Sequence, residues 1–240
     1  MSFYSRFAAC YEQVFPFREE VYRFLLGHAG PADGSVLDVG CGPGHYCGRF
    51  ARDGYRATGL DLDEAMVVEA GRHYPEAEFL CLDMRSAKTA GRGFRCIYSI
   101  GNVLAHLHRE DLAPFIDSVH GMLVPGGCWI MQVMNWDALM TVRDYRFPDK
   151  TLKADGVPAV FQRRYSNIGR DSLTFSFSLN RTSGAEIFSE RFTLYPVSGQ
   201  EYVELHDAAG FRRSGVYADF SESPVRSDPG SGLVMAFVRD

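Results

Sequence analysis

Residues 36–44 constrain this chain more than any other segment, because an apolar stretch passes into three alternating glycines in the sequence VLDVGCGPG. The apolar residues predict a buried strand, and the glycines predict a tight turn into a following helix. Glycine tolerates positive φ and has no Cβ, so the backbone of such a turn can approach a ligand closely. The segment therefore predicts a nucleotide-like ligand at the carboxyl end of the first strand.

The spacing of the glycines argues against a nicotinamide or flavin site. They follow G-x-G-x-G rather than G-x-G-x-x-G, and an acid, Asp38, lies within the end of the strand. A second acid, Asp61, ends the next predicted strand, residues 57–61. On these two motifs the chain resembles the class I S-adenosylmethionine-dependent methyltransferases, which implies S-adenosyl-L-methionine as cofactor and S-adenosyl-L-homocysteine as product.

This resemblance implies cofactor contacts around the strand ends. Asp38 and the loop glycines would surround the methionine and ribose, and Asp61 would accept hydrogen bonds from the ribose hydroxyls. Asp83, after the third predicted strand, would meet the adenine amino group; a turn or capping role is the alternative for both acids. The expected cofactor-binding set is Tyr11, Arg18, Asp38, Gly40, Gly42, Gly44, Asp61, Leu62, Met66, Asp83, Met84, Ser99 and Gly101.

Helix and strand signals alternate on both sides of the glycine loop. Residues 2–28 predict two helices interrupted at Pro16, and further helices are expected at 45–53, from Asp63 onward, and at 109–123. Further strands are expected at 57–61, 78–82, 96–100, 129–134, 211–220 and 233–238. The alternation predicts a doubly wound α/β fold, with a seven-stranded, mostly parallel sheet that an antiparallel last strand closes.

The pattern changes after residue 140. Three segments rich in Phe, Thr, Ser and Tyr, with partial alternation, predict antiparallel strands at 160–165, 172–179 and 187–194. We expect a single domain, residues 1–240, with a helical lid at 1–28 and an inserted antiparallel subdomain at 141–198. The insertion should cover the carboxyl ends of the strands, where ligands of open α/β sheets bind.

Short motifs after the fourth predicted strand make the resemblance to methyltransferases more specific. Residues 101–107 read GNVLAHL, a Pro-Gly-Gly turn follows at 125–127, and Asn-Trp-Asp lies at 135–137. Together with RFTLYP at 191–196, they resemble glycine N-methyltransferase and related sarcosine and small-amine enzymes. The resemblance implies in-line transfer of a methyl group to a small-molecule acceptor, first of all an amine.

The catalytic assignments leave alternatives open. An amine must be neutral to attack, so His106, Asn135 or a tyrosine hydroxyl could accept its proton, although His106 is equally explained as a structural residue that begins a helix. An O-methyltransferase of a small metabolite or natural product, and a non-catalytic S-adenosylmethionine-binding module, are the alternative functions.

Residues on the predicted lid and insertion are also ambiguous. Tyr4, Tyr11 and Arg18 either contact the cofactor or are amphipathic core and surface residues. Arg181 could bind a carboxylate, but a surface turn explains it better.

Composition excludes several classes of partner. The chain has 30 acidic and 25 basic residues, a net charge of -5, which argues against nucleic acid as the main partner. No apolar run approaches the roughly 18 residues of a membrane span, and no signal-peptide pattern opens the chain. The six cysteines form no C-x-x-C pair, so reduced thiols are favoured over disulfides or zinc ligands. We expect a soluble, cytoplasmic protein with a small-molecule partner, no membrane association and no metal; its oligomeric state is left open.

Overall fold

The computed structural model describes residues 11–240. The first part of the expected lid, which includes Tyr4, lies outside these residues. Residues 11–14 are helical, and the chain is irregular from Phe15 to Arg18, as the proline at position 16 predicts.

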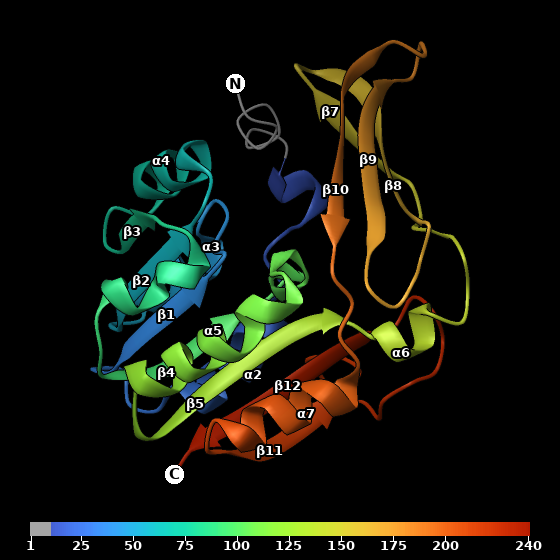
Figure 1. Cartoon of the computed structure of the whole chain (residues 1–240). Coiled ribbons are helices and arrows are strands. Elements are labelled where there is room, and N and C mark those ends of the chain that lie inside the picture. The colour runs from blue at the N-terminus through green and yellow to red at the C-terminus, as the bar shows by residue number, and fades with distance from the viewer. Residues whose placement is uncertain (1–10) are drawn as a thin grey trace.

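A seven-stranded sheet forms the centre of the molecule, in the order β11-β12-β5-β4-β1-β2-β3 (Figure 1). Strands β1 to β5 are parallel, and β12 pairs antiparallel with both β5 and β11. The strands are β1 (Ser35–Val39), β2 (Arg56–Asp61), β3 (Glu78–Cys81), β4 (Phe94–Ser99), β5 (Leu123–Met134), β11 (Phe211–Tyr217) and β12 (Gly232–Arg239). This confirms the predicted doubly wound sheet, whose order reverses between β1 and β4.

Helices cover both faces of this sheet and divide the core into two clusters. Helices α5 and α7 pack on one face around Trp129 and Phe115, and α2 and α3 pack on the other around Phe50 and Tyr98 (Figure 1). Helix α4 lies beside β2 and β3. Their bounds are α2 (Glu19–Ala29), α3 (His45–Arg52), α4 (Glu64–His73), α5 (Arg109–Met122) and α7 (Gly199–Ala208).

Three short helical segments follow strands of the central sheet. They are η1 (Met84–Ala90), η2 (Val103–His106) and α6 (Trp136–Leu139). The Pro-Gly-Gly segment expected as a turn is part of β5, where the pairing with β4 shifts register and Gly126 adopts a φ of 75°.

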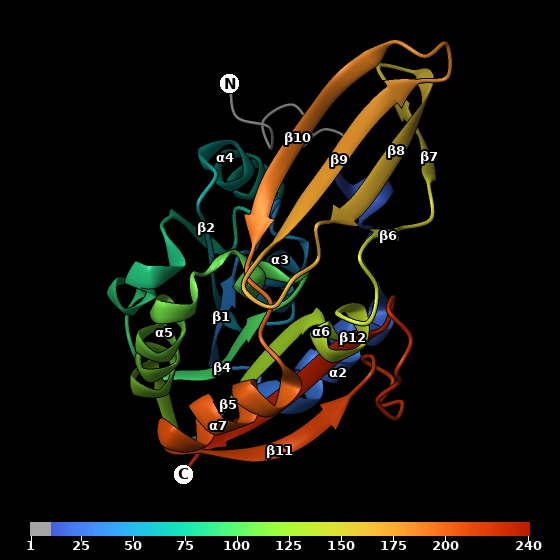
Figure 2. The same ribbon diagram turned by 45° about the vertical axis from the view of Figure 1, so that its right-hand side comes forward.

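A second, five-stranded antiparallel sheet follows β5 and lies over the carboxyl ends of the central strands (Figure 2). Its strands are β6 (Tyr145–Arg146), β7 (Lys150–Ala154), β8 (Val157–Ser166), β9 (Leu173–Arg181) and β10 (Glu186–Leu194). The three long strands were predicted. The two short ones were not, because Pro148 and charged residues interrupt the alternation there.

We call the face of this sheet that carries Phe161, Tyr165, Phe175 and Phe177 its inner face. Alternate residues of a strand point to opposite faces, so these side chains lie on one side together. Val14 is fully buried and packs with Phe161 and Phe177 in one cluster. The residues that precede α2 are therefore packed against the antiparallel sheet.

Of the structure from residue 11 onward, no helix combines the length and the apolar character needed to cross a membrane.

A buried histidine holds α7 on the central sheet. Trp129 Nε1 donates a hydrogen bond to His206 Nε2 at 2.9 Å, and His206 Nδ1 lies 2.6 Å from the carbonyl oxygen of Tyr202. The imidazole also stacks on Phe237, with 3.8 Å between ring centroids. A neutral ring with its proton on Nδ1 satisfies both polar contacts. Burial lowers the pKa of His206 to about 4, and the Tyr202 carbonyl opposes part of this shift.

The lowered pKa predicts a loss of stability in acid. Between pH 6.5 and 4 the unfolded chain takes up a proton at His206 that the folded chain does not, so the free energy of unfolding falls by about 2 kcal/mol by pH 5. In His206→Gln this contribution is absent, and urea denaturation at pH 7 and pH 5 should show a shallower pH dependence than in the wild type. Equal pH dependence in the two proteins would contradict the assignment.

Candidate functional site

A cavity of about 460 Å³ lies where the inner face of the antiparallel sheet meets the carboxyl ends of β1 and β4. Its walls come from three parts of the chain: residues 11–21, the ends of β1 and β4, and the inner face. Of the residues predicted from sequence, those that line it are Tyr11, Arg18, Asp38, Gly40, Gly101 and His106.

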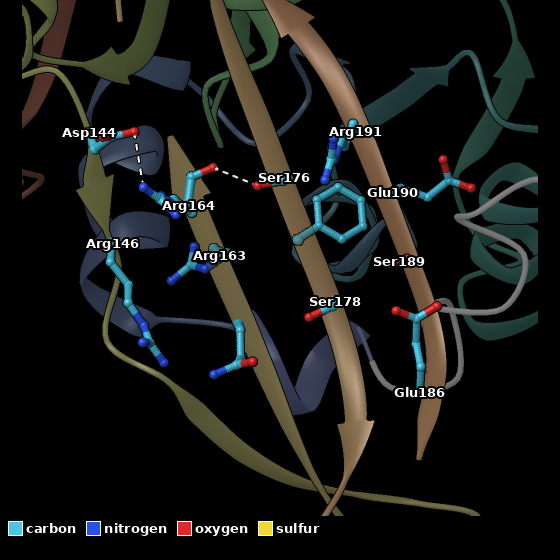
Figure 3. Close-up of a pocket in the computed structure, with 12 residues that line it drawn as sticks. Asp144, Arg146, Arg163, Arg164, Ser176, Ser178, Glu186, Ser189, Glu190 and Arg191 are labelled. Atoms are coloured by element: carbon cyan, nitrogen blue, oxygen red, sulfur yellow. Dashed lines mark hydrogen bonds and ion pairs between the residues drawn. The ribbon is translucent and has the colours of Figure 1, made fainter. Parts of the chain in front are cut away.

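A larger hollow of about 1010 Å³ lies along the antiparallel sheet and is lined by residues between Asp144 and Arg191 (Figure 3). Its wall includes Arg164 and Arg146, which pair with the carboxylates of Asp144 at 3.3 Å and Asp149 at 2.9 Å. Because this hollow is built without the glycine loop, we place the candidate site in the smaller cavity.

The glycine loop after β1 is tied to β2. The backbone N–H groups of Gly40 and Cys41 donate to the carbonyl oxygen of Leu60 at 2.8 and 3.0 Å. Gly42 N–H donates to Asp61 Oδ2 at 2.8 Å, and Asp63 N–H donates to Asp61 Oδ1 at 3.0 Å. Asp61 is thus a structural acceptor for the loop, and each of its oxygens keeps capacity for a further donor.

The three glycines differ in what surrounds them. All have positive φ, at 80° for Gly40, 53° for Gly42 and 82° for Gly44. A Cβ on Gly40 would lie 2.6 Å from the side chain of Val103, and one on Gly44 would lie 2.6 Å from Phe79. A Cβ on Gly42 would meet only Tyr11, at an ordinary 3.5 Å. Gly40 and Gly44 are therefore required by packing, whereas Gly42 is not.

Asp38 is a buried carboxyl with unused hydrogen-bonding capacity. It is 2% exposed, and within residues 11–240 its Oδ1 has no hydrogen-bond partner. Burial raises the pKa of Asp38 to about 8, with Asp61 adding to the shift and the neighbouring Tyr98 opposing it. Burying such a group is costly unless a donor or a cation meets it. Asp38 thus fits a ligand that brings an ammonium group to the end of β1.

The residues expected to contact adenine lie outside the cavity, at the ends of β2 and β3. Leu82 N–H donates to the Asp61 carbonyl oxygen at 2.9 Å and so holds the two strand ends together. Leu62 is 71% exposed, whereas Met66 is buried. Asp83 caps η1 and pairs with Arg85 at 2.6 Å. Asp83 thus has the capping role that was the alternative, on a surface next to Asp61.

Two predicted residues are engaged in structural contacts away from the cavity lining. Asn135 caps α6: its Oδ1 accepts from Ala138 N–H at 3.3 Å, and its Nδ2 donates to the Arg226 carbonyl oxygen at 2.7 Å. Ser99 Oγ donates to the Val39 carbonyl oxygen at 2.8 Å. Both are buried, so neither is retained in the catalytic or ligand-binding roles considered below.

His106, the last residue of η2, lines the cavity on the β4 side. The side chain of His106 is exposed to solvent, but desolvation by the surrounding protein lowers its pKa below the ordinary 6.5, so the ring is neutral at neutral pH and can accept a proton. Asn102 begins the same turn; its Oδ1 accepts from Met134 N–H at 3.0 Å, and its Nδ2 donates to Tyr165 Oη at 3.3 Å. This last contact joins the end of β4 to the inner face of the antiparallel sheet.

The sequence reasoning missed the cavity residues that the second sheet contributes. Chief among them are Lys150, Arg163 and Tyr165. A signal was present: Arg163 alternates with Phe161 and Tyr165, so a charge occupies a position that the strand pattern assigns to the apolar face. His45, which opens α3 beside Tyr11, was also missed.

The structure from residue 11 onward contains no group of three or more His, Cys, Asp or Glu side chains that could hold a metal ion. The cysteines in that part of the chain are free thiols, at positions 41, 47, 81, 96 and 128. Cys10 lies outside it.

Known proteins resemble this chain in sequence and in fold. A family model described as a methyltransferase domain matches residues 36–127, the segment from β1 into β5. The putative methyltransferase YqeM of Bacillus subtilis (strain 168) is 27% identical over 223 residues, which cover 85% of this chain and 88% of the relative. Among solved structures, an S-adenosylmethionine-dependent methyltransferase from Clostridium acetobutylicum ATCC 824 has a TM-score of 0.80 at 15% identity and covers 99% of both chains.

Two relatives are named for the amines that they methylate. dTDP-3-amino-3,4,6-trideoxy-alpha-D-glucopyranose N,N-dimethyltransferase of Streptomyces venezuelae is 28% identical over 78% of this chain and 79% of its own. Glycine N-methyltransferase of Oryctolagus cuniculus is 28% identical, but over only 44% of this chain and 42% of its own. The family model spans the glycine loop and the parallel strands beside it, so residues 36–127 form a methyltransferase domain, and the chain as a whole has the fold of an S-adenosylmethionine-dependent methyltransferase.

Proposed function

We propose that this methyltransferase transfers a methyl group to the amine nitrogen of a small molecule that binds in the cavity. The observation that carries the proposal is that one cavity of about 460 Å³ reaches both the glycine loop at Asp38 and a neutral His106. A cavity of this size suits a small molecule rather than a macromolecule. The relatives named for an amino sugar and for glycine support a nitrogen acceptor.

The cofactor would bind across the ends of β1, β2 and β3. Asp38 would meet the ammonium of its methionine part, and Asp61 would use its remaining acceptor capacity on the ribose hydroxyls. Leu62, which is exposed, and Asp83 and Met84, which are partly buried, follow the ends of β2 and β3 and would take the adenine. Tyr11, whose hydroxyl lies over Gly42, would cover the methionine part from the lid.

Arg18 is the remaining lid candidate. It lines the cavity and pairs with Glu20, with its side chain 56% exposed. A guanidinium that is already paired and partly solvated can exchange partners at low cost. We therefore keep Arg18 as a contact for the cofactor carboxylate.

The protein has to align the acceptor nitrogen with the methyl group and to remove a proton from that nitrogen. Bound S-adenosylmethionine supplies a methyl group already activated on a sulfonium sulfur. The cavity orients the nitrogen lone pair behind the methyl carbon and excludes water, a contribution of roughly 7 to 11 kcal/mol in favourable cases. In the proposed reaction the nitrogen would bond to the methyl carbon as the S–C bond breaks and leaves its electron pair on sulfur, and His106 would accept the proton that the nitrogen loses.

We also propose that residues 1–28 act as the lid and 141–198 as the cover of this cavity within one domain. The described part of the lid supports this, because Gln13 Nε2 donates to the Lys153 carbonyl oxygen at 3.1 Å and Lys153 N–H donates to Gln13 Oε1 at 3.0 Å.

Removal of the Asp61 carboxylate should weaken cofactor binding. Asp61→Ala deletes the acceptor for Gly42 N–H and for the ribose, so we expect the Kd for S-adenosylhomocysteine to rise more than about tenfold in calorimetry. Asp61→Asn, which keeps one acceptor oxygen, should lose less. Glu64→Gln, an exposed acid three residues on, is the matched control and should bind normally. Unchanged affinity in Asp61→Ala would refute the assignment.

The glycine loop offers a second comparison. Gly44→Ala should lower the unfolding temperature strongly, because its Cβ would clash with Phe79 at 2.6 Å and Ala70 at 2.9 Å. Gly42→Val lacks such a clash and should cost about 1–2 kcal/mol from its positive φ, yet lose most affinity for S-adenosylhomocysteine. Full affinity in Gly42→Val would show that the ligand does not approach the loop closely there.

The proposed reaction is tested by following S-adenosylhomocysteine release with a panel of small acceptors: glycine, sarcosine, amino sugars, larger amines and phenols. We expect turnover of at least one amine and N-methylated product by mass spectrometry. Products methylated only on oxygen would replace the proposal by an O-methyltransferase, and cofactor binding without turnover of any amine would count against it.

The His106 variants refine the same assay. His106→Ala should lower kcat by about a hundredfold or more and leave cofactor affinity unchanged. Because the lowered pKa keeps His106 neutral, wild-type kcat should fall only below pH 6.5, and this acid limb should disappear in the variant. An unchanged kcat would make His106 a structural residue.

A further inference from the structure

Arg163 is a charged side chain built into an aromatic surface of the cavity. It shares the inner face with Phe161 and Tyr165, and its guanidinium lies 4.5 Å from the ring centroid of Phe147 and 5.3 Å from that of Phe15. Its Nε is buried and, within residues 11–240, has no hydrogen-bond partner. Aromatic faces attract a guanidinium but leave its in-plane N–H groups without acceptors.

No carboxylate in the described part of the chain pairs with Arg163. The acid on the same cross-strand row is Glu190, which is exposed and lies beyond Phe177 on β10, two strand spacings or about 10 Å away. Asp38, the one acid among the described residues of the cavity wall, lies at the glycine loop. Residues 1–10 include neither Asp nor Glu.

A second cation strengthens the positive charge at this end of the cavity. Lys150 lines the same wall, donates to the Val14 carbonyl oxygen and lies 5.2 Å from the ring centroid of Phe15. Burial lowers the pKa of Lys150, and the charges of Arg163 and Arg18 lower it further. The cations therefore repel one another.

Arg164, the next residue of β8, has a different environment from Arg163. Arg164 points to the other side of β8, where it pairs with Asp144 and is 58% exposed (Figure 3). Arg163 is only partly exposed, its Nε is buried without a hydrogen-bond partner, and no carboxylate within residues 11–240 pairs with it. Such a charge is costly unless an anion meets it, and the guanidinium fork matches carboxylate and phosphate oxygens.

We propose that the acceptor carries, besides its amine, an anionic oxygen group, a carboxylate or a phosphate ester, that binds to Arg163 with Lys150 beside it. The inference rests on the proposed amine methylation and adds the substrate class. Tyr165 accepts a hydrogen bond from Asn102 at the end of β4, so it lies at the end of the cavity where methyl transfer is proposed. Arg163 lies two residues along β8, about 7 Å farther from the central sheet, so the anion would bind at the end of the cavity away from the methyl group.

The first test compares acceptors that differ only in the anionic group. The pairs are glycine with methylamine, O-phosphoethanolamine with ethanolamine, and glucosamine 6-phosphate with glucosamine. We expect methylation of the anionic member of at least one pair, and the pair that responds identifies a carboxylate or a phosphate. Equal kcat/KM for both members of every pair that reacts would overturn the proposal.

The second test uses neighbouring arginines as a matched pair of variants. Arg163→Met should raise KM for the anionic acceptor by about tenfold or more, change kcat much less and leave the Kd for S-adenosylhomocysteine unchanged, with partial recovery in Arg163→Lys. Arg164→Met should alter none of these values. Equal KM in Arg163→Met and the wild type would overturn the proposal, as would a loss of S-adenosylhomocysteine affinity that accounts for the whole effect.

A binding measurement separates this proposal from the proposed reaction. Sodium phosphate and sodium acetate are added at constant ionic strength to protein saturated with S-adenosylhomocysteine, and the unfolding temperature is recorded. An increase in the wild type that Arg163→Met abolishes and Arg164→Met retains supports the anion site even if no amine is methylated. If amines are methylated but neither anion acts through Arg163, the reaction stands and the anion site is refuted.

Discussion

Hydrogen bonds between the turn after β1 and the end of β2 hold the glycine loop in place. Leu60 accepts from Gly40 and Cys41 through its carbonyl oxygen, and the Asp61 carboxylate accepts from Gly42. One strand end thus supplies both the backbone acceptor that shapes the loop and the side chain that we propose for the ribose. Because parallel strands present their carboxyl ends at one edge, the other proposed cofactor contacts lie beside these hydrogen bonds.

A second set of contacts covers the cavity and connects segments that lie far apart in the sequence. Residues 11–18 bind to the antiparallel sheet through Val14 in its apolar cluster and through the reciprocal hydrogen bonds of Gln13 and Lys153. The sheet in turn meets the end of β4 through Tyr165 and Asn102. Residues 11–18 and the antiparallel sheet are therefore parts of one packed unit, which explains why a single cavity reaches both the glycine loop and the side chains of Lys150 and Arg163.

The predictions from local pattern succeeded where a short motif carries its own geometry. The loop glycines have positive φ, Asp61 ends β2, and the order of helices and strands is as expected. Prediction was weaker where a side chain had two possible uses. Asn135 lies in a string that resembles a catalytic one, but the start of α6 needs an acceptor for its free N–H groups, and Asn135 supplies it. Arg181, the last residue of β9, was noticed because the sequence predicts a turn there, whereas Arg163 was missed because a charge on an apolar strand face is recognised only from the strand register.

By itself, the sequence determined the resemblance to methyltransferases, the doubly wound sheet and the glycine loop at the end of its first strand, because glycine spacing and hydrophobic period act over a few residues. Only the tertiary structure decided which glycines are demanded by packing, since Phe79 reaches Gly44 and Gly59 from another strand. It also decided which polar residues form caps and strand contacts, and that Lys150 and Arg163 line the same cavity as His106. These relations join residues dozens of positions apart, and a local sequence pattern does not encode such distances.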